Sequence, residues 1–196
     1  MKPTVSATFS SRAKTGTGRV APRLANRVLA VGIASSLLFI TGCAVKNVED
    51  ELGYKPEARS PLSANSEIDS LSSQLVRWMK VEGEVTEEGA SETPCGVDGS
   101  NDQHFYSRHF WSIYDLTKGT LGEAMSELRD RFHGPEWELT KDGRDGSKAN
   151  SPELRAINRS TGHKVFAVWR SNRSGGNVDL INFIVESRCY EAPRET

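Results

Sequence analysis

Four side chains of the kinds that bind metal ions lie close together in the chain, namely Asp98, Asp102, His104 and His109. A calcium loop of the EF-hand type needs glycine at its sixth position, where Gln103 stands here. A zinc site needs three or four converging ligands. His104 and His109 are five residues apart on an expected strand, so their side chains should point to opposite faces. The spacing therefore favours a turn that leads into a strand, without a bound metal.

Enzyme chemistry has its own spacing patterns, and two common ones are missing from the sequence. There is no Gly-x-Ser-x-Gly elbow to expose a reactive serine and no phosphate-binding P-loop. The 26 Asp and Glu residues supply many carboxylates, but abundance does not show that two of them converge. The sequence therefore predicts no catalytic residue and no cofactor.

An uncharged apolar run of 13 residues, Val28–Ile40, follows a basic segment that ends at Arg27. A membrane-spanning helix needs about 20 apolar residues, whereas the apolar region of a secretory signal peptide needs roughly 7 to 15. The length of the run therefore predicts an exported protein.

The run ends in Ile40-Thr-Gly-Cys43, which resembles the lipobox of bacterial lipoproteins. The resemblance implies a type II signal peptide, residues 1–42, that is cleaved between Gly42 and Cys43. It also implies that the thiol of Cys43 carries diacylglycerol, whose two acyl chains would hold the protein on the extracytoplasmic face of the cell membrane. An ordinary secretory signal, in which Cys43 is incidental, is the alternative.

Charge divides the chain at the same place. Residues 1–42 hold six Lys and Arg residues and no acid, so the other 19 Lys and Arg residues stand against all 26 Asp and Glu residues, a formal charge of −7. Binding to nucleic acid, or electrostatic adhesion to an anionic lipid surface, needs clustered basic residues. The acidic balance argues against both.

The chain has three cysteines, and export would place them in an oxidising compartment where thiols inside a domain pair. If lipid occupies Cys43, then Cys95 and Cys189 remain as one pair. A bond between them would close a loop of about 95 residues and, on the chain-entropy model, stabilise the fold by roughly 4 to 5 kcal/mol. No Cys-x-x-Cys spacing marks a redox motif, and two isolated cysteines do not make a zinc site. We therefore expect a structural disulfide.

A change of composition marks the expected start of the folded domain. Residues 44–64 are polar and show no sustained apolar period, so residues 43–64 are expected to be a lipidated N-terminus and polar tether. A single extracytoplasmic domain is expected over residues 65–196. The acidic stretch 82–92 within it is expected to be a solvated loop.

Two helices are expected in the domain. Over residues 66–79, apolar side chains recur at spacings of three and four, and Ser66 stands where a capping residue belongs. Over residues 121–132, the helix follows a capping box formed by Thr120 and Glu123. Each apolar stripe must be buried against another element.

The rest of the domain has the composition of an antiparallel sheet. Strand-forming residues bounded by turn signals occupy residues 105–114, 137–140, 154–158, 164–170 and 178–187. The predicted fold class is α+β, an antiparallel β-sheet of about four to five strands with two helices packed on one face and one structural disulfide.

Five aromatic residues on the expected strand 105–114 divide between two faces. Phe105 and Trp111 share one face, and Tyr106, Phe110 and Tyr114 share the other. One set should be core. An exposed second set would line a groove for a peptide, lipid or glycan, whereas a covered set would be only packing, which we favour from the sequence.

The whole arrangement is similar to small uncharacterised lipoproteins of actinobacteria. The likeness rests on the lipobox, the polar stretch, Cys95-Gly before an aromatic strand, and a last strand that ends in Glu186-Ser-Arg-Cys189. It implies the anchor and the fold, and no catalytic residues. We expect a membrane-anchored module that binds an envelope protein or a small ligand without chemistry of its own. A small cell-surface hydrolase or metal-dependent enzyme is one alternative, and a mere spacer is another.

Overall fold

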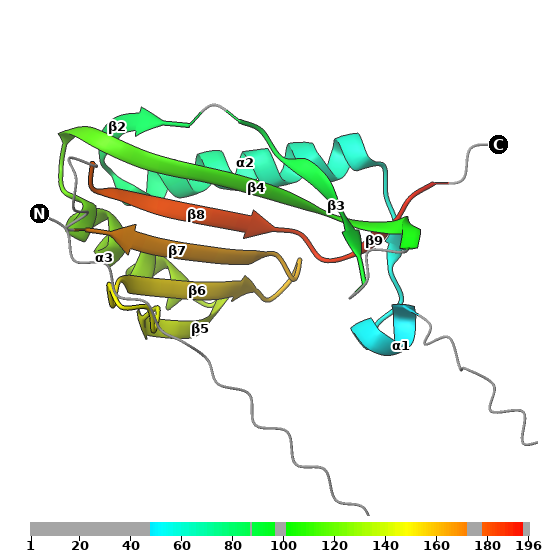
Figure 1. Cartoon of the computed structure of the whole chain (residues 1–196). Helices are drawn as coiled ribbons and strands as arrows, with labels where there is room; N and C mark the ends of the chain where they lie inside the picture. The colour runs from blue at the N-terminus through cyan, green and yellow to red at the C-terminus, as the bar shows by residue number, and fades with distance from the viewer. Residues whose placement is uncertain (1–47, 87, 97–100, 172–177, 194–196) are drawn as a thin grey trace, which may run out of the picture. The chain divides into compact units, whose positions relative to one another are not determined.

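The structure is a computed structural model that describes residues 48–86, 88–96, 101–171 and 178–193 (Figure 1). Residues 44–196 form one compact unit by their internal contacts. The described elements, in chain order, are α1 (Val48–Leu52), β1 (Glu57–Ala58), α2 (Pro61–Met79), β2 (Glu82–Val85), β3 (Ser91–Cys95), β4 (Asn101–Lys118), α3 (Leu121–Phe132), β5 (Trp137–Arg144), β6 (Pro152–Asn158), β7 (Lys164–Arg170), β8 (Leu180–Glu186) and β9 (Tyr190–Glu191).

The nine described strands form one sheet in the hydrogen-bonded order β1-β9-β4-β8-β7-β6-β5. The strands β8 and β9 follow one another along one edge of β4, and β2 and β3 pair with its opposite edge. All the described pairings are antiparallel except that of β1 with β9. The predicted α+β class and antiparallel sheet are confirmed.

The expected number of four to five strands is wrong, because it missed short strands at the sheet edges. The stretch 82–92, expected to be a solvated loop, supplies β2 and the beginning of β3. These strands are short and rich in Glu, and they lack the apolar alternation that indicates a strand. Charged side chains suit edge strands, because they discourage pairing with other chains.

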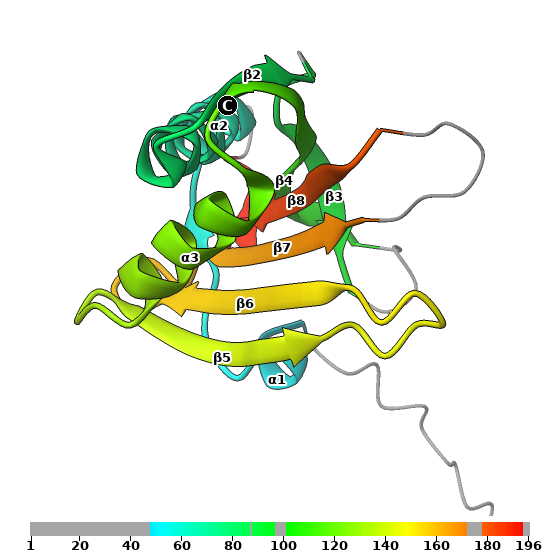
Figure 2. The same cartoon turned by 90° about the vertical axis from the view of Figure 1, so that its left-hand side faces the viewer.

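The helices α2 and α3 pack on the same face of the sheet (Figure 2). The capping box of α3 is present, since the Thr120 hydroxyl accepts a hydrogen bond from the Glu123 backbone N–H and the Glu123 carboxylate accepts one from the Thr120 backbone N–H. The helix α2 begins earlier than expected. Its N-cap is Ser60, not Ser66, and Leu62, the large apolar residue in the added turns, is 81% exposed and so does not belong to the buried stripe. None of the described helices is both long and apolar enough to cross a membrane.

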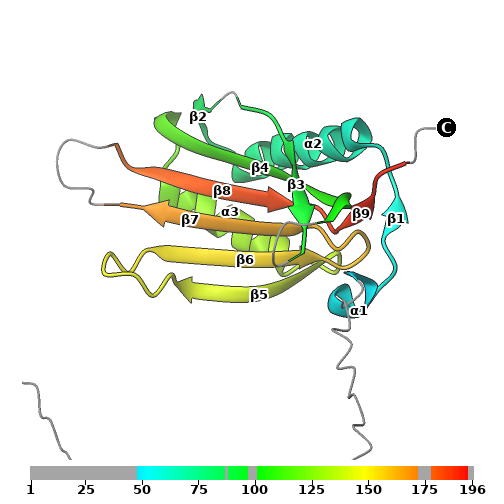
Figure 3. The same ribbon diagram turned by 45° about the vertical axis from the view of Figure 1, so that its right-hand side comes forward.

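Much of the expected tether is ordered structure. The helix α1 precedes β1, and β1 pairs with β9 at the end of the sheet (Figure 3). The Arg59 backbone N–H extends this pairing by donating to the Glu191 carbonyl at 2.9 Å. The expectation of an irregular tether and a domain start at residue 65 is therefore wrong for residues 48–64, and residues 43–47 lie outside the described part of the chain.

The core lies between the sheet and the two helices. Trp111 of β4 stacks on Phe183 of β8, with ring centroids 4.0 Å apart. Trp137 at the start of β5 contacts Phe132 of α3 and Trp78 of α2, with centroids 5.1 and 6.0 Å apart. The contacts of Trp137 therefore join both helices to the β5 edge of the sheet, and the Trp111–Phe183 stack joins β4 to β8.

The expected disulfide is present, between Cys95 and Cys189. Cys95 ends β3 and Cys189 precedes β9, and these two strands pair with opposite edges of β4. The Cys189 backbone N–H also donates to the Tyr54 hydroxyl at 2.8 Å. The bond therefore joins the end of β3 to the start of β9 across β4, next to the end of α1.

Replacing both cysteines, Cys95→Ala with Cys189→Ala, should lower the free energy of unfolding by about 2 to 5 kcal/mol. The denatured chain regains the freedom that the bond removes, because the two positions are 94 residues apart. Urea unfolding measures the loss. Dithiothreitol should reduce the stability of the unmodified protein and leave the double variant unchanged. Equal unfolding midpoints for the oxidised protein and the double variant would contradict a stabilising bond.

Candidate functional site

The strand β4 sorts its aromatic side chains onto two faces, as its two-residue period requires. Phe105 and Trp111 face the helices and are 7% and 3% exposed. Tyr106, Phe110 and Tyr114 lie on the opposite side of the sheet, which we call the outer face, and Phe110 is 53% exposed. Neither α2 nor α3 packs over this row, so the expectation that both sets are packed is wrong for Phe110. Two helices on one side of the sheet leave the other side uncovered (Figure 2).

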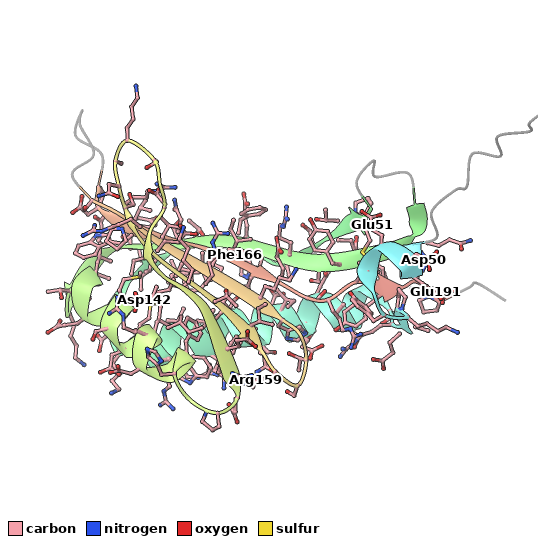
Figure 4. The ribbon with its side chains drawn as sticks, turned by 90° about the horizontal axis from the view of Figure 1, so that it is seen from below. Asp50, Glu51, Asp142, Arg159, Phe166 and Glu191 are labelled. Atoms are coloured by element: carbon pink, nitrogen blue, oxygen red, sulfur yellow. A yellow bond between two sulfur atoms is a disulfide. The ribbon has the colours of Figure 1, made fainter. Side chains whose placement is uncertain are left out.

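A row of large side chains crosses the outer face from strand to strand. Phe110 lies opposite Ile184, Ile184 lies opposite Phe166, and Phe166 lies opposite Arg155. Figure 4 shows Phe166 on the side of the sheet away from the helices. A hollow of about 930 Å³, here called the apolar cleft, is lined by Phe110, Phe166, Val168 and Ile184 together with Ser112, Arg170 and Asn182. Its size falls within the range of small-molecule sites.

Two arginine side chains lie over aromatic rings of the outer face. The Arg108 guanidinium carbon is 4.9 Å from the Tyr106 ring centre and 5.2 Å from that of Phe110. The Arg155 guanidinium carbon lies 5.3 Å from the ring centre of Phe166. Such stacking covers part of an aromatic face while the charge stays in water. The apolar surface is therefore interrupted by fixed cations.

A buried carboxylate holds one of these arginines in place. Glu153 is 3% exposed and forms ion pairs with Arg155 and with Lys141, whose Nζ lies 2.5 Å from Glu153 Oε2. Burial raises the pKa of Glu153, but hydrogen bonds and positive charge from Lys141 and Arg155 outweigh burial and hold that pKa below its ordinary value of 4.5. Glu153 is therefore ionised at neutral pH and is paired with two basic side chains.

The loop between β5 and β6 is tied to the apolar cleft through Asp145. Its carboxylate accepts hydrogen bonds from the backbone N–H groups of Ser147 and Ser151, and Arg170 Nη1 lies 2.6 Å away. Desolvation raises the pKa of Asp145, but the hydrogen bonds from Ser147, Arg170 and Ser151 together lower it to about 2. Arg170 is therefore held at the cleft by a carboxylate that stays ionised in mild acid.

A second hollow of about 640 Å³, here called the cationic hollow, lies toward the α1 end of the sheet. Tyr54, Tyr106, Lys164, Glu186 and Arg188 line it, and Arg159 and Glu51 contribute to its wall. Glu186 is held by Arg108, whose Nε donates to its Oε1 at 2.7 Å. The Arg188 guanidinium carbon lies 4.3 Å from the Tyr54 ring centre. The hollow therefore combines aromatic walls with basic side chains.

A serine, a histidine and a carboxylate meet on the inner face of β4. His109 Nδ1 lies 2.9 Å from the Ser72 hydroxyl and 3.4 Å from Asp69 Oδ1, both on α2. A catalytic triad needs the serine and the carboxylate on different ring nitrogens, but here the other nitrogen contacts the Glu88 backbone carbonyl. Asp69 also accepts a hydrogen bond from the Ala90 backbone N–H at 2.8 Å. This cluster fastens the β2–β3 connection to α2.

The residues considered as metal ligands do not come together. His104 and His109 differ by an odd number of positions on β4 and lie on opposite faces. Asp98 and the side chain of Asp102 lie outside the described part of the chain. Among the described residues, no three His, Cys, Asp or Glu side chains are placed to hold a metal ion together.

Of the residues given roles from the sequence, Cys95 and Cys189 lie at the wall of the cationic hollow. Gly42 and Cys43 lie outside the described residues. A comparison of the chain with protein-family models, with curated proteins and with solved structures found no match in any of the three.

Sequence reasoning missed the contribution of β7 to the outer face, although the sequence contains a signal for it. On β7, Val165 and Ala167 point toward the helices, whereas Phe166 and Val168 point to the outer face. Apolar residues on both faces of a strand need cover on both sides. The two expected helices can cover only one face of the sheet. The number of expected helices therefore indicated that an apolar strip on the other face would be exposed.

The variant Asp145→Asn should remove an acid-dependent part of the stability. The pKa of Asp145 is about 2 in the folded protein and about 3.9 in an unfolded chain. Its ionised form therefore stabilises the fold fully above about pH 4, and this contribution is lost as the pH falls toward 2. Thermal unfolding midpoints of the two proteins should differ at pH 5 and converge near pH 2. A constant difference over this interval would contradict the assignment.

Proposed function

We propose that the protein is a lipid-anchored, extracytoplasmic binding module of the cell envelope, and that it acts through its outer face without chemistry of its own. One observation carries the proposal: Phe110 is 53% exposed beside a cleft of about 930 Å³ with apolar walls. Contiguous exposed apolar surface with polar groups at its border is typical of interaction sites.

Energetics support a ligand on this surface. Full burial of a Phe or Ile side chain stabilises a protein by about 1.5 to 3 kcal/mol. Phe110, Phe166 and Ile184 lie side by side and forgo part of that stabilisation in the free protein. A partner that covers all three gains it on binding, so an envelope protein or a small ligand with an apolar part is the occupant we propose. The acidic chain after residue 42 disfavours nucleic acid.

The anchor is the second part of the proposal and rests on the lipobox residues. We propose cleavage between Gly42 and Cys43 and a diacylglycerol on the Cys43 thiol. Val48, where α1 begins, is five positions after Cys43, and five Cα–Cα steps span at most about 17 Å. An anchored protein would therefore hold its α1 end near the membrane surface.

The variant Cys43→Ser should move the protein from the membrane fraction to the soluble fraction, because it lacks the thiol that takes the lipid. Mass spectrometry of membrane-extracted protein should also show a diacylglycerol on the unmodified protein and none on the variant. As a control, the double variant Cys95→Ala with Cys189→Ala should stay in the membrane fraction. A membrane fraction unchanged by Cys43→Ser would exclude the lipid anchor.

Thermal unfolding of residues 44–196 against metals, cell-wall fragments, lipids and metabolites should identify a ligand for the outer face. A ligand at 100 times its dissociation constant adds about 2.7 kcal/mol, which raises the unfolding midpoint by several degrees. Phe110→Ser should reduce that shift. The control Leu62→Ser should not, because it removes an apolar side chain that is 81% exposed at the start of α2.

Equal shifts in the Phe110→Ser and Leu62→Ser variants would place the ligand away from the outer face. A flat panel would exclude the ligand classes tested and point to a protein partner. Crosslinking on intact cells, with Phe110→Ser as the comparison, would then test that partner.

A further inference from the structure

The two hollows of the outer face adjoin along the same strands. Phe166 lines the apolar cleft, and Lys164, two residues before it on β7, lines the cationic hollow. On β8, Ile184 likewise lines the apolar cleft, and Glu186, two residues after it, lines the cationic hollow. Residues two apart on a strand share a face and lie about 7 Å from each other. The cleft and the hollow therefore lie next to each other on the outer face, and we treat the two together as one groove, apolar at one end and basic at the other.

Two basic side chains of the cationic hollow, Lys164 and Arg188, form no ion pair among the described residues. Lys164 forms no ion pair there, and Glu186, its neighbour across the strands, is held by Arg108 at 2.5 Å. Arg188 stacks on Tyr54, and its Nε is buried without a hydrogen-bond partner. A buried donor without an acceptor costs free energy, which an anionic oxygen at this position would offset.

We propose that this groove binds one molecule of an anionic phospholipid. The acyl chain lies along Phe166, Ile184 and Phe110 in the apolar cleft, and the phosphate contacts Lys164 and Arg188 in the cationic hollow. The inference rests on the proposed binding function of the outer face and names its ligand.

Both halves of the ligand are needed to match both halves of the groove. Each methylene of an acyl chain that leaves water contributes about 0.8 kcal/mol, but this term does not discriminate between head groups. A phosphate oxygen forms charge-assisted hydrogen bonds with Lys and Arg. The formal charge of −7 after residue 42 disfavours adhesion to an anionic surface as a whole. Electrostatic attraction of an anionic lipid is therefore confined to the groove. This agrees with binding of a single lipid molecule and not of a whole membrane surface.

The position of the groove agrees with a lipid supplied by the membrane. Leu52 of α1 and Tyr54 just after it line the cationic hollow. With Cys43 lipidated, only four residues would separate the bilayer anchor from α1. The basic end of the groove would then lie near the phosphates of the membrane surface.

Isothermal titration calorimetry on residues 44–196 tests the inference with three probes. The first is lysophosphatidylglycerol, which has one acyl chain and a phosphate. The second is monoacylglycerol with the same chain and no phosphate, and the third is glycerol 3-phosphate, which has no chain. Below the micelle concentration, lysophosphatidylglycerol should bind about tenfold more tightly than monoacylglycerol. Glycerol 3-phosphate should bind at least about a hundredfold more weakly than lysophosphatidylglycerol.

Three variants assign the two ends of the groove. Lys164→Gln should weaken the binding of lysophosphatidylglycerol about tenfold and leave the binding of monoacylglycerol unchanged. Phe166→Ser should weaken the binding of both lipids. Lys118→Gln removes a lysine at the far end of β4, where its partner is Glu82, and should affect neither. Circular dichroism of each variant shows whether it is folded.

Equal binding of lysophosphatidylglycerol and monoacylglycerol would overturn the phosphate contact, and so would equal effects of Lys164→Gln and Lys118→Gln. Unchanged lipid binding by Phe166→Ser would overturn the acyl-chain position. If lysophosphatidylglycerol does not bind, the lipid inference fails. The proposed function would still stand if another ligand gave a thermal shift that Phe110→Ser removes, so the two failures are distinguishable.

Discussion

The two-residue period of β4 is the constraint on which the rest of the structure depends. This 18-residue strand pairs with β2 and β3 on one edge and with β8 and β9 on the other. Its pleat therefore sets which side chains of every neighbouring strand face the helices. Trp111 and Phe183 follow that register into the core. Phe110 and Ile184, one position away on the same strands, follow it to the outer face, where Phe110 is exposed and Ile184 is half-buried.

An apolar strip on an uncovered sheet is an aggregation hazard, and charged side chains limit it here. Arg108 and Arg155 lie over the rings of the strip, and Glu186 and Glu153 fix their guanidinium groups. These paired charges interrupt the strip without changing its net charge greatly. Lys164 differs from them because no described carboxylate pairs with it. The contrast between paired and unpaired cations gives the groove a direction, from an apolar end to a basic end.

Local signals in the sequence predicted the elements that form through local contacts. The capping box of Thr120 and Glu123 placed the start of α3, and turn residues placed β7 at residues 164–170. Cysteine counting paired Cys95 with Cys189. Elements held by distant partners were missed. The two-residue strand β1 exists because it pairs with β9, more than 130 residues away, and its own residues carry no strand signal.

By itself, the sequence determined the fold class, the two main helices, the disulfide and the alternation of aromatic residues along β4. These follow from residue type and spacing, because a side chain's face on a strand or helix is a local property. Only the tertiary structure decided that one alternating set remains uncovered, that residues 48–64 join the domain, and that Phe166 and Lys164 complete a groove with residues of β4 and β8. Whether a face of the sheet is covered, and which side chains meet on it, depend on the strand order and on the position of the helices. Both arise from contacts between residues far apart in the chain.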